Sequence, residues 1–292
     1  MIPAYLKFSV TVFLMMLLFS TIKASASHNG PRHSILERRD SWASFVDLWK
    51  DQTNNRGNRL IDIEVVKDGN KLWYTGIFVP GSGGHALYQF STFASFVDKF
   101  SELHADGYAL MDFDILTVDG TTLHTGVWRK GNKGQYLYCY NNWNDFKTKW
   151  QDLSGKNYRL FDVDFERLLT VEGNYKPNRP LKLTERFCGV WKPATGGHYL
   201  ANTNWQKFTN LWKDLGKKGV KLRDVGMYFK DNSIVYVGAF VAGNTKSALY
   251  RYDSYQSIHN RWADLDSKGY RMTDIEALHI DGKTYYTGVW AK

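Results

Sequence analysis

The sequence predicts an α+β fold built from five tandem β-α-β-β repeats of about 50 residues each. Two independent sequence markers recur with this period, and a helical pattern of large apolar residues recurs between them. One repeat cannot bury that apolar face alone, so neighbouring repeats must stack. We therefore expect one repeat domain with antiparallel sheets, arranged as a curved half-barrel or as a closed five-fold toroid.

The first marker is an aspartate two residues after a leucine or methionine, and the second is a glycine with large side chains two residues away on both sides. The aspartates are Asp62, Asp112, Asp162, Asp224 and Asp274, and the glycines are Gly76, Gly126, Gly189, Gly238 and Gly288. Successive aspartates are separated by 50, 50, 62 and 50 residues, and successive glycines by 50, 63, 49 and 50. Because both markers share one long interval, the third repeat carries an insertion, around residues 171–182.

Each repeat is expected to begin with a short strand, such as residues 136–140, followed by a helix. The side chains that can cap the helices are Ser41, Thr92, Asn142, Asn204 and Ser254. Large apolar residues then recur on one helical face, as Trp143, Phe146 and Trp150 do in the third repeat. The helices are expected to end at residues that tolerate the left-handed conformation, namely Gly57, Gly107, Asn157, Gly219 and Gly269.

Two further strands complete each repeat. Residues 108–114 represent the second strand, and Asp119-Gly120 represents the tight hairpin turn that leads into the third. The third strand ends in the glycine marker. The predicted units are about 34–78, 85–128, 135–191, 198–240 and 247–290, within a single repeat domain of residues 34–292.

The N-terminal segment has the pattern of a secretory signal peptide. Lys7 precedes an apolar run over residues 8–22, and Ala24-Ser25-Ala26 supplies a small-residue cleavage site. A membrane anchor is the alternative, but spanning a bilayer needs about 20 apolar residues. We therefore expect a signal peptide at residues 1–26, a short lead at 27–33, no transmembrane segment and a secreted protein.

The composition limits the class of partner. Lys plus Arg is 38 and Asp plus Glu is 29, a formal charge of +9, which falls to nearer +7 without Lys7 and Lys23. This balance favours anionic partners, but the basic residues are scattered, so nucleic acid ranks below an extracellular glycan or protein. The 11 Trp, 18 Tyr and 17 Phe fall mostly at repeating core positions, so packing explains most of them.

The two cysteines, Cys139 and Cys188, are 49 residues apart. This separation is close to one repeat period, and we expect the cysteines on strands of adjacent repeats. In an oxidising compartment they can form a disulfide. Two buried free thiols are the alternative.

The five repeated aspartates are candidates for chemistry as well as structure. Four of them have a second carboxylate two residues on, on the same strand face: Glu64, Asp114, Asp164 and Glu276. Five-fold repetition favours hydrogen bonding to turns or backbone, because a catalytic acid and base need different environments. Cation binding and catalysis are the alternatives. Gly226 in the fourth repeat argues against a regular ring of ion ligands.

The polar, glycine-rich loops between repeats are the candidate recognition surface. Their sequences vary while the strands repeat, as expected of loops on a fixed scaffold. The candidate ligand-binding residues are His85, His198, Gln135, Lys130, Lys133, Lys192 and Lys246. A simple surface loop is the alternative, and no metal-ligand spacing accompanies the histidines.

The repeat resembles the bacterial tandem repeat domain found in the N-terminal part of fungal polyglycine hydrolases. The motifs that carry the resemblance are Asn157–Val163, Gly269–Ile275 and Tyr286–Trp290, and the pattern covers residues 34–292. In those hydrolases the repeats precede a serine β-lactamase-like catalytic domain. No Ser-x-x-Lys motif occurs within residues 34–292. The resemblance therefore implies a stand-alone repeat module without protease activity.

These observations predict a secreted, non-catalytic repeat module that binds an extracellular glycan or protein through its loop rim, with no cofactor and no metal. One alternative is a secreted hydrolase or other enzyme with an asymmetric pocket near the insertion, where the pattern is broken by Glu172, Lys176, Arg179 and Glu185. Another is a structural or adhesive extracellular protein.

Overall fold

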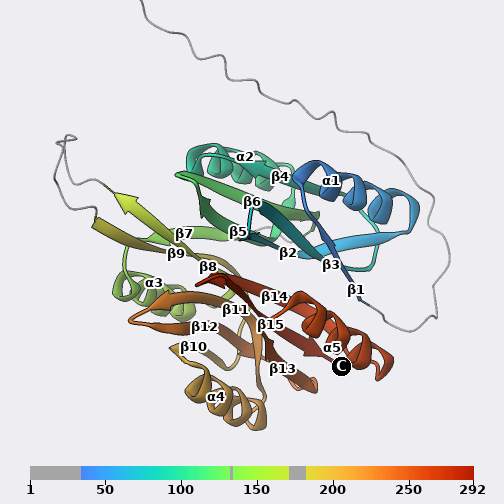
Figure 1. Cartoon of the computed structure of the whole chain (residues 1–292). Coiled ribbons are helices and arrows are strands. Elements are labelled where there is room, and N and C mark those ends of the chain that lie inside the picture. The colour runs from blue at the N-terminus through green and yellow to red at the C-terminus, as the bar shows by residue number, and fades with distance from the viewer. Residues whose placement is uncertain (1–33, 132–133, 171–181) are drawn as a thin grey trace, which may run out of the picture. The chain divides into compact units, whose positions relative to one another are not determined.

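Each repeat folds into a three-stranded antiparallel sheet and one helix (Figure 1). The computed structural model describes residues 34–131, 134–170 and 182–292, which belong to one compact unit. The predicted signal peptide, the lead at 27–33, Lys133 and most of the insertion lie outside the described residues. None of the described helices is long and apolar enough to cross a membrane.

The predicted order of strand, helix, strand, strand is confirmed in all five repeats. The first strands are β1 (Ile35–Arg39), β4 (His85–Phe90), β7 (Tyr136–Tyr140), β10 (His198–Asn204) and β13 (Ser247–Tyr252). The helices are α1 (Trp42–Lys50), which continues into the π-helical turn η1 (Asp51–Asn55), α2 (Phe93–Ala105), α3 (Trp143–Gly155), α4 (Trp205–Lys217) and α5 (Tyr255–Ser267).

The second and third strands form the hairpin of each repeat. The second strands are β2 (Asn58–Asp68), β5 (Tyr108–Val118), β8 (Tyr158–Thr170), β11 (Val220–Lys230) and β14 (Arg271–Ile280). The third strands are β3 (Lys71–Pro80), β6 (Thr121–Lys130), β9 (Lys182–Pro193), β12 (Ser233–Ala242) and β15 (Lys283–Ala291). The third strand is central in every sheet, as in the order β1-β3-β2.

The helix ends follow the sequence signals. Each of the five predicted capping side chains accepts a hydrogen bond from a backbone N–H three residues later, as Asn142 does from Asp145 at 2.9 Å. In each repeat, the residue that was expected to adopt the left-handed conformation after the helix has a positive φ, from +61° at Asn157 to +78° at Gly107. The helices therefore start and stop where their own residues dictate.

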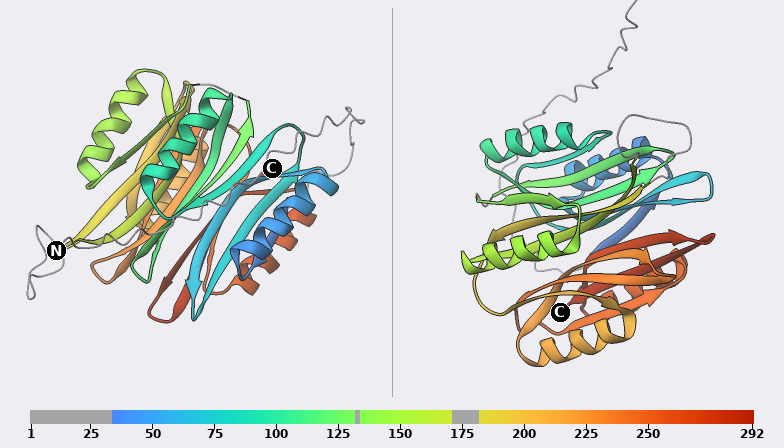
Figure 2. Two further views of the ribbon diagram at one scale, coloured as in Figure 1. Left: turned by 90° about the horizontal axis from the view of Figure 1, so that it is seen from above. Right: turned by 90° about the vertical axis from the view of Figure 1, so that its left-hand side faces the viewer.

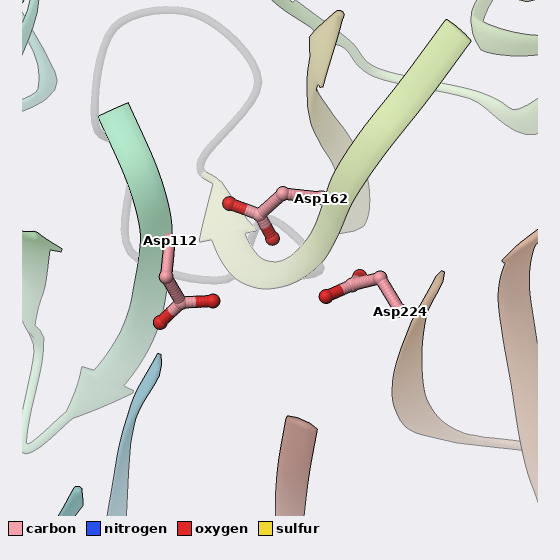
Figure 3. A group of neighbouring side chains, drawn as sticks. All are labelled: Asp112, Asp162 and Asp224. Atoms are coloured by element: carbon pink, nitrogen blue, oxygen red, sulfur yellow. The ribbon is translucent and has the colours of Figure 1, made fainter. Parts of the chain in front are cut away.

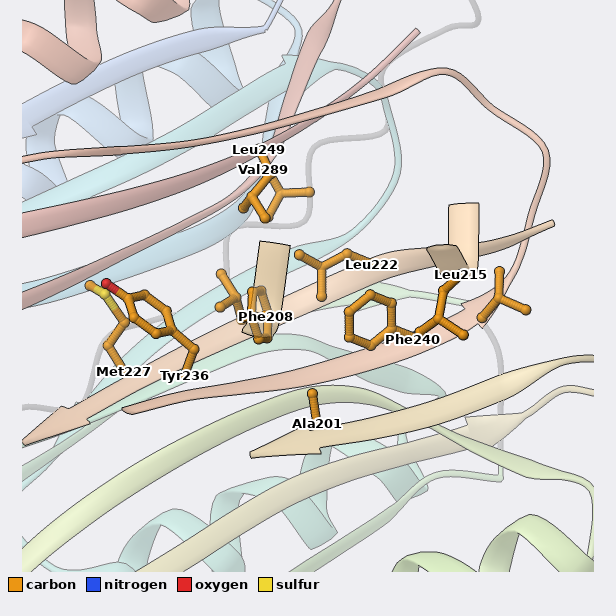
Figure 4. Packing of buried hydrophobic residues seen from close by; sticks show 11 residues of the cluster. Ala201, Phe208, Leu215, Leu222, Met227, Tyr236, Phe240, Leu249 and Val289 are labelled. Atoms are coloured by element: carbon orange, nitrogen blue, oxygen red, sulfur yellow. The ribbon is translucent and has the colours of Figure 1, made fainter. Parts of the chain in front are cut away.

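Neighbouring repeats share their hydrophobic cores. The core of the fourth repeat, built around Phe208 and Phe240, also contains Leu249 and Val289 from the fifth (Figure 4). The core of the fifth repeat contains Leu36, Val66 and Ile77 from the first repeat. The predicted stacking of units is thus present, and it includes the first and last repeats.

The second strands lie on the inner side of the sheets and the helices on the outer side (Figure 2). β2 contacts β5, β5 contacts β8, β8 contacts β11, β11 contacts β14, and β14 contacts β2. Side chains that leave these strands on their inner faces are therefore brought together from all five repeats.

Cys139 and Cys188 form a disulfide, with an S–S distance of 1.93 Å. Cys139 lies on β7 and Cys188 directly opposite it on β9, in the same sheet. The expectation that they belong to adjacent repeats is wrong. Their separation of 49 residues is close to a repeat period only because the insertion lengthens the hairpin between the second and third strands of the third repeat.

Candidate functional site

The five marker aspartates, called the central aspartates below, meet at the inner faces of the second strands. In every repeat the pairing of the second and third strands shifts register just before the aspartate, as between Leu60 and Asp62. Such a bulge adds one residue to a strand and changes the direction of the next side chain. Leu60 therefore packs into the core of its own repeat, whereas Asp62 lines a small cavity shared by all repeats.

The central aspartates join each repeat to the one before it. The carboxylates of Asp112, Asp162, Asp224, Asp274 and Asp62 accept backbone N–H groups of Ile63, Phe113, Val163, Val225 and Ile275 at 2.7, 2.9, 2.8, 3.1 and 3.3 Å, respectively. The last of these bonds connects the fifth repeat to the first. The repeated aspartate therefore makes the same hydrogen bond to the backbone of a neighbouring strand in all five repeats. This is the bonding to backbone that the five-fold repetition of the aspartate favoured.

A second set of carboxylates lies one pleat further along the same strands. Asp114 accepts the Val65 N–H at 3.3 Å, Glu276 accepts the Met227 N–H at 3.0 Å, and Asp164 accepts the N–H of Ile115. The fourth repeat has Gly226 at this position, where an added Cβ would lie only 3.1 Å from the Val163 carbonyl oxygen.

The central cavity is small, acidic and buried. Its volume is about 10 Å³, which is about the space of one water molecule. Nine carboxylates line it: the five central aspartates together with Glu64, Asp114, Asp164 and Glu276. Three of the central aspartates, Asp112, Asp162 and Asp224, each offer an oxygen within 4.8 Å of the others and point toward one another (Figure 3).

Burial and mutual repulsion dominate the electrostatics of this cavity. Burial raises the pKa of Asp224 to about 6, and burial together with the charge of Asp224 raises the pKa of Asp112 to about 8. The pKa values of the other seven carboxylates are also raised, with burial as the largest cause. Lys192 and Arg223 act on Asp112 and Asp224 as opposing positive charges.

The predicted ligand-binding residues do not form one exposed surface. Gln135 is buried, and its amide exchanges two hydrogen bonds with the Leu110 backbone, at 2.7 and 2.8 Å. Lys192 is buried too, and burial lowers its pKa to about 8. These two residues are therefore not exposed as loop residues usually are: Gln135 bonds to the neighbouring repeat, and the Lys192 charge acts on Asp112 and Asp224.

The two histidines occupy equivalent positions beside helices of the preceding repeat. His85 lies 5.1 Å from the Trp49 ring, and His198 lies 5.3 Å from the Trp150 ring. The Nδ1 atom of each is 3.3 Å from a glycine carbonyl oxygen in its own loop. These contacts give both histidines a packing role.

The remaining two described candidates are lysines. Lys130 donates to the Asp106 carbonyl oxygen at 2.5 Å and lies over the Tyr108 ring. Lys246 is exposed, and its backbone carbonyl accepts the Lys292 N–H at 2.8 Å. Within the described residues, neither lysine lines the central cavity.

An open groove lies between the third and fourth repeats. It has a volume of about 400 Å³ and is lined by Trp143, Glu185, Phe187, Asn202, Thr203, Asn204, Tyr228, Lys230, Ser233 and Val235. Among the residues singled out in the sequence for breaking the pattern near the insertion, Glu185 is in this groove; Glu172, Lys176 and Arg179 lie outside the described residues. The sequence did not indicate Asn202, Tyr228 or Lys230 as site residues. Asn202 lies on β10 and the other two lie on β11, and the fold brings them together.

The polar groups of this groove, called the repeat 3–4 groove below, are fixed by mutual contacts. Lys230 and Glu185 form an ion pair at 3.0 Å. The Tyr228 hydroxyl donates to the Asn202 side-chain oxygen at 3.0 Å, which leaves the Asn202 amide hydrogens available to a ligand. The Trp143 ring is held edge-on by Phe187, with 5.4 Å between the ring centroids.

The fold and the central aspartates define a tandem β-α-β-β repeat protein whose units are joined through buried carboxylates. Residues 43–80, 90–131 and 252–292 match the family model described as the polyglycine hydrolase-like structural repeat. These segments fall in the first, second and fifth repeats, so the resemblance seen in the sequence is confirmed for these three repeats. A search of curated proteins finds no match to the chain.

Proposed function

We propose that this protein is a secreted, non-catalytic repeat module that binds an extracellular glycan through the repeat 3–4 groove. The observation that carries the proposal is the groove itself, in which an indole, two asparagines and hydroxyl groups surround an open space of about 400 Å³. Sites for small ligands have volumes of about 300–1,000 Å³ and combine apolar faces with a few fixed polar groups.

The chemistry of the lining favours a sugar. A sugar ring has apolar C–H faces and a rim of hydroxyl groups, so it needs a flat apolar surface and groups that both donate and accept. Trp143 offers the surface, and the side-chain amides of Asn202 and Asn204 offer donors and acceptors. Because Lys230 is paired with Glu185, this pair adds no net charge, which favours a neutral glycan over an acidic one.

The same proposal includes closure of the five repeats into a toroid, which would make the groove a fixed junction between two units. Ser34 of the first repeat supports closure, since its Oγ accepts the Met272 N–H at 3.0 Å and the Trp262 indole N–H at 3.1 Å. The bond from the Ile275 N–H to Asp62 supports it as well. A half-barrel would leave these partners of the first and fifth repeats apart.

Secretion and binding are tested on the same preparation. The full chain is expressed in a secreting host, and the N-terminus of the protein in the medium is determined by mass spectrometry. We expect residue 27 to be the first residue. The purified protein is then screened on a glycan array, and a hit is confirmed by titration calorimetry with that oligosaccharide.

The repeat structure supplies a matched control variant. Trp143 and Trp205 are the first residues of α3 and α4, and Trp143 is the one that lines the groove. Trp143→Leu is expected to weaken binding at least about tenfold because it removes the stacking surface, whereas Trp205→Leu leaves affinity within about twofold. If His85→Ala retains glycan binding, this would support a binding site in the repeat 3–4 groove and argue against a site on the loops between repeats. A negative array, or equal affinities of the two tryptophan variants, would contradict the proposal.

A further inference from the structure

We propose that the central cavity binds one Ca²⁺ ion, with carboxylate oxygens of Asp112, Asp162 and Asp224 as its ligands. The three residues come from the second, third and fourth repeats and lie on β5, β8 and β11. They point toward a common space between the strands (Figure 3). A single ion there would connect three repeats that are otherwise joined by hydrogen bonds and core packing.

The donor atoms suit calcium. One oxygen from each of the three side chains lies within 4.8 Å of the other two. Calcium is bound by carboxylate oxygens at about 2.3–2.6 Å in flexible geometry, whereas magnesium demands a near-ideal octahedron at about 2.0–2.1 Å, which three side chains fixed on separate strands supply less readily. The cavity volume of about 10 Å³ accommodates one particle of this size.

A buried oxygen outside this group of three points independently to a missing partner. Asp114 is 6 % exposed and lines the same cavity; one of its oxygens accepts the Val65 N–H, but its Oδ2 has no hydrogen-bond partner among the described residues. Asp62, which also lines the cavity, is 3 % exposed and has the Ile275 N–H and the Asp274 side chain as partners. A buried carboxylate oxygen without a partner is costly, and a cation in the cavity would satisfy it.

The balance of charge around the central cavity also favours a bound cation. Nine carboxylates line the cavity, and the positive side chains acting on Asp112 and Asp224 are those of Lys192 and Arg223. Side chains thus supply far less positive charge than the carboxylates require for ionisation. A divalent ion would supply two further positive charges at the place where the oxygens are closest.

The fourth repeat explains why the three residues gather on one side. Gly226 follows Asp224 by two residues, and a Cβ there would lie 3.1 Å from the Val163 carbonyl oxygen. The glycine allows β11 to approach β8 closely beside Asp224 and Asp162. Gly226 stands where the other four repeats have a second carboxylate, and this argued against a regular ring of ion ligands. The same glycine favours an off-centre site with three ligands.

The test uses the secreted full chain, stripped with EDTA and exchanged into metal-free buffer. Calorimetric titration with CaCl₂ is expected to give one site per chain with a dissociation constant in the range of about 10⁻⁴–10⁻³ M or below, as in extracellular calcium modules. The midpoint of thermal unfolding is expected to rise in 10 mM CaCl₂, and to rise less in 10 mM MgCl₂ (about ten times the upper dissociation constant).

The decisive variant is Asp162→Asn. The amide keeps an oxygen for the Phe113 N–H but removes the charge, so calcium affinity is expected to fall at least about tenfold. Glu166→Gln is the matched control, because Glu166 is also a buried carboxylate of β8 but pairs with Arg186 at 3.2 Å and does not line the cavity. Its calcium affinity should stay within about twofold of the wild type.

Two results would overturn the proposal. One is a wild-type protein with no calcium binding at 10 mM, about ten times the expected upper dissociation constant, and the same unfolding midpoint in EDTA and in calcium; protons would then neutralise the carboxylates. The other is unchanged calcium binding in Asp162→Asn, which would place the ion elsewhere. If Asp162→Asn does not fold, the calcium content of the wild type by native mass spectrometry and its calcium-dependent unfolding midpoint decide the question.

Discussion

Replacing Gly126 with alanine should lower stability more than most single methyl additions would. Gly126 lies in the central strand β6 and pairs with Tyr88 on one side and Phe113 on the other. An added Cβ would lie 2.3 Å from the Trp128 ring and 2.8 Å from the Phe96 ring, whereas ordinary contacts are 3.4–4 Å. Both rings are fully buried and have no free space into which to move.

The expected cost follows from this overlap. Overpacking a well-filled core typically costs about 1–3 kcal/mol, and two overlapped rings on a strand fixed from both sides place Gly126→Ala at about 3 kcal/mol. For a domain of this size, each kcal/mol lowers the unfolding midpoint by about 2–4 °C. We therefore expect thermal unfolding, followed by circular dichroism, to shift down by about 6–12 °C.

Gly155→Ala is the matched control. Gly155 is the last residue of α3, and nothing lies within 4 Å of an added Cβ. Alanine is the better helix former by up to about 1 kcal/mol, so the unfolding midpoint should stay the same or rise slightly. A shift below about 2 °C in Gly126→Ala would refute the reasoning, because it would mean that the marker glycine is not required by ring packing.

Three further predictions concern the buried polar groups and the disulfide. In calcium-free buffer the free energy of unfolding should fall as pH rises from 4 to 8. Carboxyls such as Asp112, with a pKa of about 8, keep their protons in the folded state over this range, whereas the unfolded chain releases them near pH 4. Urea titrations that show a rise in the free energy of unfolding would contradict this. Asp62→Ala should cost about 1–3 kcal/mol by leaving the buried Ile275 N–H unpaired, and urea unfolding equal to that of the wild type would be the contrary result. Replacing Cys139 and Cys188 together by serine should cost about 2–4 kcal/mol, and dithiothreitol should lower the wild-type unfolding midpoint to a similar extent.

The elements could be predicted because their signals are local. A capping side chain such as Asn142 and a left-handed residue such as Asn157 act within a few residues of themselves, and both fall at the ends of α3. The shared inner face of Asp162 and Asp164 follows in the same way from the alternation of a strand, and both residues line the central cavity. Repetition then made each local inference testable five times.

Burial against a neighbouring repeat could not be predicted from such signals. Gln135 follows a glycine-rich loop, where a polar side chain is normally exposed, yet it is 5 % exposed and bonded to the preceding repeat. Lys192 follows Trp191 at the end of the third strand and is 7 % exposed. Both outcomes depend on where the adjacent unit lies, which the spacing of motifs does not specify.

The repeat 3–4 groove was beyond sequence reasoning for a related reason. Trp143 begins a helix, Asn202 lies on a first strand and Tyr228 on a second strand, so no motif contains all three. Their proximity depends on the angle at which two repeats meet. The insertion was the available signal, and Glu185 beside it was the one lining residue that it indicated.

Both proposed sites involve the third and fourth repeats, where the five-fold pattern is broken. A residue that recurs in all repeats must satisfy the same packing requirement five times, as the central aspartates do with their backbone bonds. A ligand needs the opposite, a place where one unit differs from the others. Gly226 creates such a difference beside the central cavity, and Glu185 and Lys230 create another at the groove. If calcium stiffens the contact between β8 and β11, it should also hold Tyr228 of β11 in the groove, and glycan affinity should then fall when calcium is removed.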